Sequence, residues 1–348
     1  MSPRSFAIAA VLCGSLLQPA LAKDPAALPL PDPFDVASAA ASLVEVSGVK
    51  ALKDIKGNRR VAVPQFSIEF VTQDSVSSET SGFAAAGRAS VSGYYRLTGV
   101  AEPEFQALTE QLYASFVQAL QAQGLEVLTP QQLAASPTWA KLTAGGVQMP
   151  VRGETSITVA PPGMALYGTH RMLANTSKKG ALAALAGFGA AVTGISESVE
   201  NVTLQKELDG AALVEVSMKL HFAQLKNENR GFLSGLSNTA AVSAKLHPIL
   251  THARMTVMSG PEGSTLSTKA PLLLDPAAFT EVRKEAATTG EIAGAVAVGL
   301  LRMAIGSKDS SSSEKYEVVA EPQRYRERIA ANLAQTHAML IARMVSEQ

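Results

Sequence analysis

Residues 59–73 read Arg-Arg-Val-Ala-Val-Pro-Gln-Phe-Ser-Ile-Glu-Phe-Val-Thr-Gln, the strongest β-strand signal in the chain. Most of the apolar residues are β-branched or aromatic, which suits a pleated and half-buried surface. Val61 and Val63 alternate in one phase, whereas the apolar set that begins at Phe66 alternates in the other. A β-bulge absorbs such a change of side. We therefore predict a bulge or a kink around Pro64-Gln65, with the first half of the stretch in a central sheet.

The second half of this stretch predicts a long β-hairpin over residues 61–99. Residues 89–98 alternate between apolar and polar, as in an antiparallel strand with one face toward solvent. Ser-rich flanks and the glycines that bound residues 82–87 indicate that the tip projects from the body. We expect this projecting hairpin to meet a partner. The candidate interaction surface comprises Phe83, Tyr94, Tyr95, Arg96 and Phe188.

A long amphipathic helix is predicted to follow the hairpin. Pro103 stands in its first turn between two acidic residues, and apolar residues recur three and four apart from Phe105 to Leu120. Gly124 ends the helix, and the apolar residues 125–128 predict a short strand. This strand, helix, strand unit indicates an α/β (α+β) fold in which helices flank a central mixed sheet.

Later segments extend this sheet. Residues 213–222 alternate as a half-buried strand, and residues 241–258 predict a longer strand interrupted at Pro248. The turn at residues 259–263 leads into a further strand at 264–274, which makes a hairpin. The chain ends in an amphipathic helix that begins near Pro322.

Two runs of small apolar residues, 180–195 and 292–305, predict helices buried against the sheet or against each other. The alternative for them is contact with a membrane or a subunit. The first is shorter than the roughly 20 residues that a helix across a bilayer needs. The polar, Ser-rich residues 308–315 predict a flexible linker.

The amino terminus has the features of a secretory signal peptide over residues 1–22. Arg4 carries positive charge, residues 6–17 form an apolar core, and Ala20-Leu21-Ala22 matches a cleavage site. Cys13, the one cysteine, lies inside this segment. We therefore expect an exported, periplasmic protein without thiol chemistry. An acylated lipoprotein cysteine is the less favoured alternative, because Leu12 stands where a small residue is expected.

The predicted organisation has four parts. They are the signal peptide at 1–22, a Pro-rich tether with an N-terminal helix at 23–58, a single α/β domain at 59–285 that includes the hairpin arm 61–99, and a small-residue helix, Ser-rich linker and C-terminal helix at 286–348.

Composition and motifs argue against several classes of function. Of the 348 residues, 47% are hydrophobic, and Lys+Arg and Asp+Glu balance at 30 each. A neutral chain lacks the basic surface that non-specific nucleic-acid binding requires. The five histidines show no metal-ligand spacing, and no Gly-x-Ser-x-Gly nucleophile motif occurs. We expect no cofactor, no metal and no catalytic residue.

Three pieces of sequence together carry a resemblance to a known family. They are Val61-Ala62-Val63-Pro64 with the helix 105–120 and strand 124–128, then residues 164–169, and then the strand, glycine turn, strand of residues 254–266. This order resembles the α/β fold shared by the curli-type secretion channel lipoproteins and the amino-terminal domain of TolB. The likeness spans about residues 59–275. It implies a non-enzymatic part of envelope assembly or secretion, often a ring, and no functional residue is carried over.

Two functions follow as expectations. The first is a non-enzymatic periplasmic or outer-membrane-associated protein that binds an envelope protein or itself, with contact to a membrane surface as a further role for the hairpin. The lack of a convincing acylated cysteine weakens the expectation of an outer-membrane anchor. The second is a periplasmic hydrolase or small-ligand-binding protein with a cleft at the sheet edge.

Overall fold

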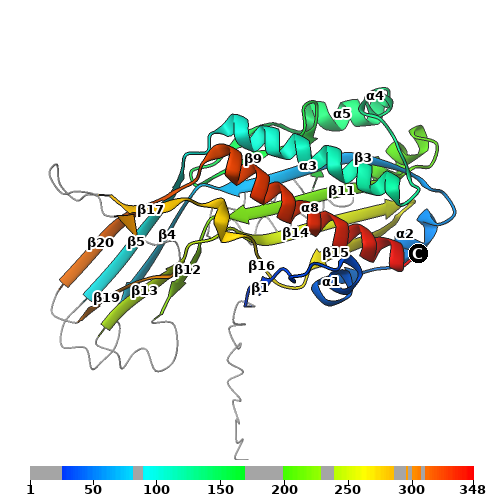
Figure 1. The fold of residues 1–348 in the computed structure, drawn as a ribbon. Helices are drawn as coiled ribbons and strands as arrows, with labels where there is room; N and C mark the ends of the chain where they lie inside the picture. The colour runs from blue at the N-terminus through cyan, green and yellow to red at the C-terminus, as the bar shows by residue number, and fades with distance from the viewer. Residues whose placement is uncertain are drawn as a thin grey trace, which may run out of the picture.

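The computed structural model describes residues 26–80, 89–168, 199–228, 239–285, 295–296, 300–306 and 310–348. Phe83 and Phe188 lie outside these residues, as do the predicted signal peptide at 1–22 and the run 180–195. The described part contains a helix-covered central sheet from which a group of further strands projects (Figure 1).

Ten strands form the central sheet, in the order β1-β16-β14-β11-β3-β9-β8 with β15, β2 and β6 attached. β11 pairs parallel with β3 and antiparallel with β14, so the sheet is mixed, as predicted. The strands are β1 (Leu28–Pro29), β2 (Val44–Ser47), β3 (Arg60–Val71), β6 (Glu126–Val127), β8 (Val151–Arg152), β9 (Ser156–Val159), β11 (Ala212–His221), β14 (Ile249–Ser259), β15 (Glu262–Thr268) and β16 (Leu272–Leu273).

Strand β3 contains the predicted bulge. Its pairing with β11 changes from Ala62 opposite Leu213 to Gln65 opposite Glu215, which leaves two residues of β3 facing one of β11. The prediction that the second half of β3 leaves the sheet is wrong. β3 continues to pair with β11 as far as Phe70. This pairing buries Phe66, Ile68 and Phe70 on the face of the sheet that the helices cover.

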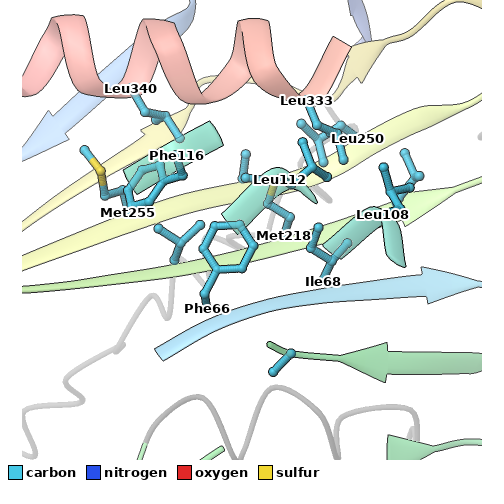
Figure 2. Close-up of a cluster of buried hydrophobic side chains, with 14 of the residues drawn as sticks. Phe66, Ile68, Leu108, Leu112, Phe116, Met218, Leu250, Met255, Leu333 and Leu340 are labelled. Carbon is cyan, nitrogen blue, oxygen red and sulfur yellow. The ribbon is translucent and has the colours of Figure 1, made fainter. Parts of the chain in front are cut away.

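Two long helices cover this face of the sheet: α3 (Glu102–Ala122) and α8 (Pro322–Ser346) lie side by side across it (Figure 1). Both begin with Pro in the first turn, and Gly124 follows α3 at a φ of 75°, as predicted. Figure 2 shows the labelled apolar side chains of the sheet pointing toward those of the helices. They are Phe66, Ile68, Met218, Leu250 and Met255 from the sheet, and Leu108, Leu112, Phe116, Leu333 and Leu340 from α3 and α8.

Shorter elements complete the body. The single N-terminal helix predicted within residues 23–58 is divided into α1 (Val36–Leu43) and α2 (Lys50–Ile55), because β2 between them pairs with β15. α4 (Pro130–Ala134) and α5 (Pro137–Gly145) follow β6, and residues 199–207 are helical. The remaining elements of the body are the 3₁₀ turn η2 (Pro276–Ala278) and the two-stranded sheet of β7 (Val147–Gln148) and β10 (Ala165–Leu166). Residues 164–169, for which the resemblance implies a strand of the main sheet, therefore contribute β10 outside the central sheet.

Eight strands project from the body, and we call them the arm (Figure 1). Five form one sheet in the order β18-β17-β20-β5-β4, and three form another in the order β12-β13-β19. Their bounds are β4 (Gln73–Glu79), β5 (Ala89–Thr98), β17 (Glu281–Lys284), β18 (Ala295–Val296), β20 (Ser310–Val319), β12 (Gln224–Asn227), β13 (Thr239–Lys245) and β19 (Leu300–Gly306).

The arm corrects three predictions. Its hairpin is β4 with β5 rather than residues 61–99, and it is joined by strands from two later parts of the chain. Residues 300–306 are strand β19 rather than part of a helix, because each residue pairs with β13. Of the residues expected as a linker, 310–315 lie in β20, which pairs in parallel with all of β5.

Gly99 joins the arm to the body and tolerates no side chain. Its φ is +85°, and a Cβ there would lie 2.0 Å from the carbonyl oxygen of Ala320. We expect Gly99→Ala to lower the free energy of unfolding by more than about 2 kcal/mol, because left-handed backbone strain adds to the clash. Chemical denaturation measures this loss. Gly145→Ala, where a Cβ meets nothing within 4 Å, is the control and is expected to be neutral or stabilising; equal losses in both variants would contradict this account.

Candidate functional site on the arm

The two sheets of the arm pack face to face around a small apolar core. Ala89 and Val91 of β5 contact Ala240 and Val242 of β13, and Met303 of β19 packs against them. Closer to the body, the rings of Tyr95 and Tyr316 stack with their centroids 5.3 Å apart. Alternating residues of the strands therefore hold the arm together, and the intervening residues are left for its outer surface.

Tyr95 belongs to this interior. Its side chain is only 2% exposed, and burial raises the pKa of its hydroxyl to about 12, with a smaller contribution from the Glu314 carboxylate. Burial likewise raises the pKa of Tyr316, whose hydroxyl donates to Glu314. Tyr95 was predicted as an interaction residue, but it is a core residue because it lies on the inward face of β5.

Tyr94 and Arg96 lie on the outward face of the same strand. Tyr94 is 49% exposed, and it is directly opposite Ser75 of β4 and Lys315 of β20. Arg96 is opposite Gln73 and Glu317 and donates to the Glu317 carboxylate at 2.5 Å. Two of the described candidate residues, Tyr94 and Arg96, therefore share the outward face of β5, whereas the side chain of Tyr95 lies on its inward face.

A hollow of about 380 Å³ lies over these residues, and we call it the Tyr94 hollow. Its other lining groups come from the neighbouring strands β4 and β20, from Glu285, from the inward-facing Tyr95 and Tyr316, and from Thr155 in the loop between β8 and β9. The Thr155 carbonyl accepts from the backbone nitrogens of Thr72 and Gln73. The Lys315 ammonium lies 4.0 Å from Glu285, which follows β17. The contributions of β17 and β20 could not be found from the sequence, because residues 308–315 have the composition of a linker.

Strand β4 forms an open edge of the arm. It pairs with β5, and among the described strands none pairs with its other side. The backbone groups of Thr72 and Thr80 form hydrogen bonds with β5. In an antiparallel pair every second residue is bonded in this way, so the odd-numbered residues between them direct their N–H and C=O groups away from β5. The Asn227 amide donates to one outward carbonyl, that of Ser77, at 2.7 Å. An edge strand of this kind is a template on which another strand can add.

A second hollow, a groove of about 530 Å³, lies where the arm meets the body. It contains His221 and Asp74, whose Nδ1 and Oδ2 atoms are 3.8 Å apart, beyond hydrogen-bond distance. Burial lowers the pKa of His221 to about 4, helped by the nearby Lys219, so the imidazole is neutral at pH 7. Lys269 also lines the groove, but its ammonium donates to the carbonyls of Ala41 and Ser42 at the end of α1.

The His, Cys, Asp and Glu side chains in the described part of the chain form no group of three that could hold a metal ion. None of the helices within the described ranges is long and apolar enough to cross a bilayer. No family model, curated protein or solved structure matches the chain.

Proposed function

We propose that this chain is a non-enzymatic, exported protein of the bacterial cell envelope that acts in envelope assembly or secretion. It acts by binding an envelope protein or another copy of itself. The observation that carries the proposal is the open β4 edge, displayed on an arm that projects from a helix-covered body (Figure 1). Export rests on the features of residues 1–22.

The β4 edge supports a strand-addition mode of binding. Ser75, Ser77 and Glu79 are exposed and direct their backbone groups away from β5, so an incoming strand would add its hydrogen bonds there. The edge is also partly protected, since Asp74 accepts from the Ser75 backbone nitrogen at 2.8 Å and Asn227 occupies the Ser77 carbonyl. Polar protection of this kind restricts non-specific pairing and favours a chosen partner.

The substitution Ser77→Pro tests the edge. Proline removes one outward N–H and introduces a ring on that side, while the backbone bonds of the neighbouring residues to β5 stay in place. We expect wild-type protein to form an oligomer by light scattering, or to recover a partner after crosslinking in the envelope, and we expect Ser77→Pro to lose that association by at least tenfold in apparent affinity.

Ser77→Ala is the matched control, because it alters the same side chain and keeps the backbone N–H. It should associate as wild type does, and both variants should retain the wild-type circular dichroism spectrum. A strictly monomeric wild-type protein with no crosslinked partner would refute the proposal. Equal association by Ser77→Pro and Ser77→Ala would show that β4 is not the binding edge.

A periplasmic hydrolase or small-ligand-binding protein is the second candidate, and the groove at the base of the arm favours it. A neutral imidazole near a carboxylate is a common arrangement in general acid–base catalysis. His221 and Asp74 have this arrangement, although their 3.8 Å separation is long for a hydrogen-bonded pair. A panel of ester, peptide and glycoside substrates decides the matter: turnover that His221→Asn abolishes would support the second candidate.

A further inference from the structure

We propose that the Tyr94 hollow binds a neutral linear glycan, with the Tyr94 ring as a stacking platform. The site lies on the outer face of the five-stranded sheet and is distinct from the β4 edge, whose binding groups are backbone atoms. Its volume of about 380 Å³ is within the range of small-ligand sites.

The platform is an aromatic ring on a rigid floor. Tyr94 is 49% exposed, yet its strand is paired on both sides, by β4 and by β20. Below it, the buried stack of Tyr95 and Tyr316 supports the sheet from the inner face. A tyrosine ring held in this way offers a flat apolar surface with a polar edge, which suits the C–H face and the hydroxyl rim of a sugar ring.

The charges around the ring select against ions. Arg96 and Lys315 supply two cations, and each lies beside a carboxylate: Glu317 at 2.5 Å and Glu285 at 4.0 Å. Asp74 adds a third carboxylate to the lining. An anionic ligand would therefore meet a slight excess of negative charge, and the cations are already engaged.

The same groups match a polyhydroxyl ligand. A sugar hydroxyl both donates and accepts hydrogen bonds. It can therefore donate to the carboxylate and accept from the cation of the same ion pair. Gln73, Ser75 and Thr155 add uncharged polar groups at the rim. Apart from the tyrosines the hollow has no large apolar side chain, and serine, lysine and glutamate are depleted in protein–protein interfaces. These features favour a glycan over a lipid or a protein.

The surface beyond the hollow leaves room for a chain of sugars. Along the strands from Tyr94, small serines stand in register across the sheet, with Ser77, Ser92 and Ser313 in one row. Ser90 and Ser311 form the next row with Glu79. Rows on one face of the sheet recur about every 6.7 Å, and the serine side chains are too short to block an extended ligand.

Calorimetric titration of the purified protein tests the inference. The probes are cellohexaose and chitohexaose, which separate a plain from an N-acetylated glycan, together with the corresponding disaccharides. We expect saturable binding of at least one hexasaccharide and at least tenfold weaker binding of its disaccharide. Tyr94→Ala should weaken hexasaccharide binding at least tenfold, whereas Tyr94→Trp, which keeps a platform, should bind within about threefold of wild type.

Two further measurements isolate the site. Leu300→Ala removes another exposed side chain of the arm, 67% accessible on β19, and should bind the hexasaccharide as wild type does. Tyr94→Ala should keep the proposed β4 association, as measured by light scattering or crosslinking, so failure of that association and failure of this inference can be told apart. No binding of either hexasaccharide to wild type, or equal binding by Tyr94→Ala and wild type, overturns the inference. Equal losses in Tyr94→Ala and Tyr94→Trp overturn it too, since stacking would then not be the cause.

Discussion

Replacing Phe66 with alanine will lower the free energy of unfolding by about 3–5 kcal/mol, a large part of the roughly 5–15 kcal/mol that holds a typical domain folded. Phe66 is fully buried between the central sheet and the helices (Figure 2). Its ring centroid lies 5.5 Å from that of Tyr113, 5.8 Å from Phe116 and 5.6 Å from His337. Truncation removes all three ring contacts and leaves a cavity that strand β3 and the two helices cannot close.

Urea denaturation followed by circular dichroism measures this loss. Phe66→Leu fills most of the cavity and should cost less than half as much as Phe66→Ala. Val199→Ala is the surface control: its side chain is 64% exposed, and its effect should stay within about 0.5 kcal/mol. A loss below 1 kcal/mol for Phe66→Ala would mean that the sheet and helices do not pack as described.

The second large effect is acid destabilisation through His337. This imidazole is 1% exposed within α8, its ring centroid lies 5.2 Å from that of Phe116, and neither ring nitrogen has a hydrogen-bond partner among the described residues. Burial alone lowers its pKa to about 3. The folded state therefore holds the ring neutral, whereas the unfolded chain takes up a proton near the ordinary pKa of about 6.5.

The direction of the pH effect follows from this difference. Above pH 6.5 neither state binds the proton, so the contribution of His337 to stability is constant. As the pH falls from 6.5 toward 3, only the unfolded state is protonated, and stability declines by about 1.4 kcal/mol per pH unit. His221 acts in the same direction, because burial and Lys219 lower its pKa to about 4.

His337→Phe should flatten the decline. The test measures the free energy of unfolding at intervals from pH 7 to pH 4. Below pH 6.5, the difference between His337→Phe and the wild type should change by about 1.4 kcal/mol per pH unit in favour of the variant. His221→Asn provides the control. In a protein that already carries His221→Asn, adding His337→Phe should change the pH dependence of the unfolding free energy by the same amount as it does in the wild type. Parallel pH profiles of the wild type and His337→Phe would contradict a neutral, buried His337.

The sequence predicts the body well because local patterns and tertiary packing agree there. The bulge of β3 is visible as a change of apolar phase around Pro64, and α3 is visible from Pro103, its apolar periodicity and Gly124. These signals depend on neighbours within a few residues. Two features of the fold that rest on these local signals are predicted correctly: the fold class and the mixed central sheet.

The arm was predicted less well because its strands are defined by distant partners. Residues 310–315 are mostly serine, with the composition of a linker, and they are a strand because β5 offers them a parallel partner along its whole length. Residues 300–306 are rich in small and apolar residues that suit a helix as well as a strand, and pairing with β13 decides between the two. β-propensity depends on such context.

The candidate site shows the same limit at the level of single residues. Tyr94 and Tyr95 are identical in type and adjacent in sequence, and period-2 alternation predicts only that they lie on opposite faces. Which face is outward depends on the three-stranded sheet that covers the other. Lys315 and Glu285 reach the hollow from strands more than a hundred residues away, so no local pattern could have joined them to Tyr94.

The parallel pairing of β5 with β20 has a consequence for the order in which the protein folds. Ala89 is opposite Ser310 and Thr98 is opposite Val319, so the arm contains contacts between residues more than two hundred positions apart. Contacts of such long range form slowly, because closing the loop between them costs entropy before any bond is gained. While the chain is being synthesised, the β4–β5 hairpin has both edges unpaired until β20 arrives, and during that interval it depends on its serines, or on a chaperone, to avoid pairing with other chains.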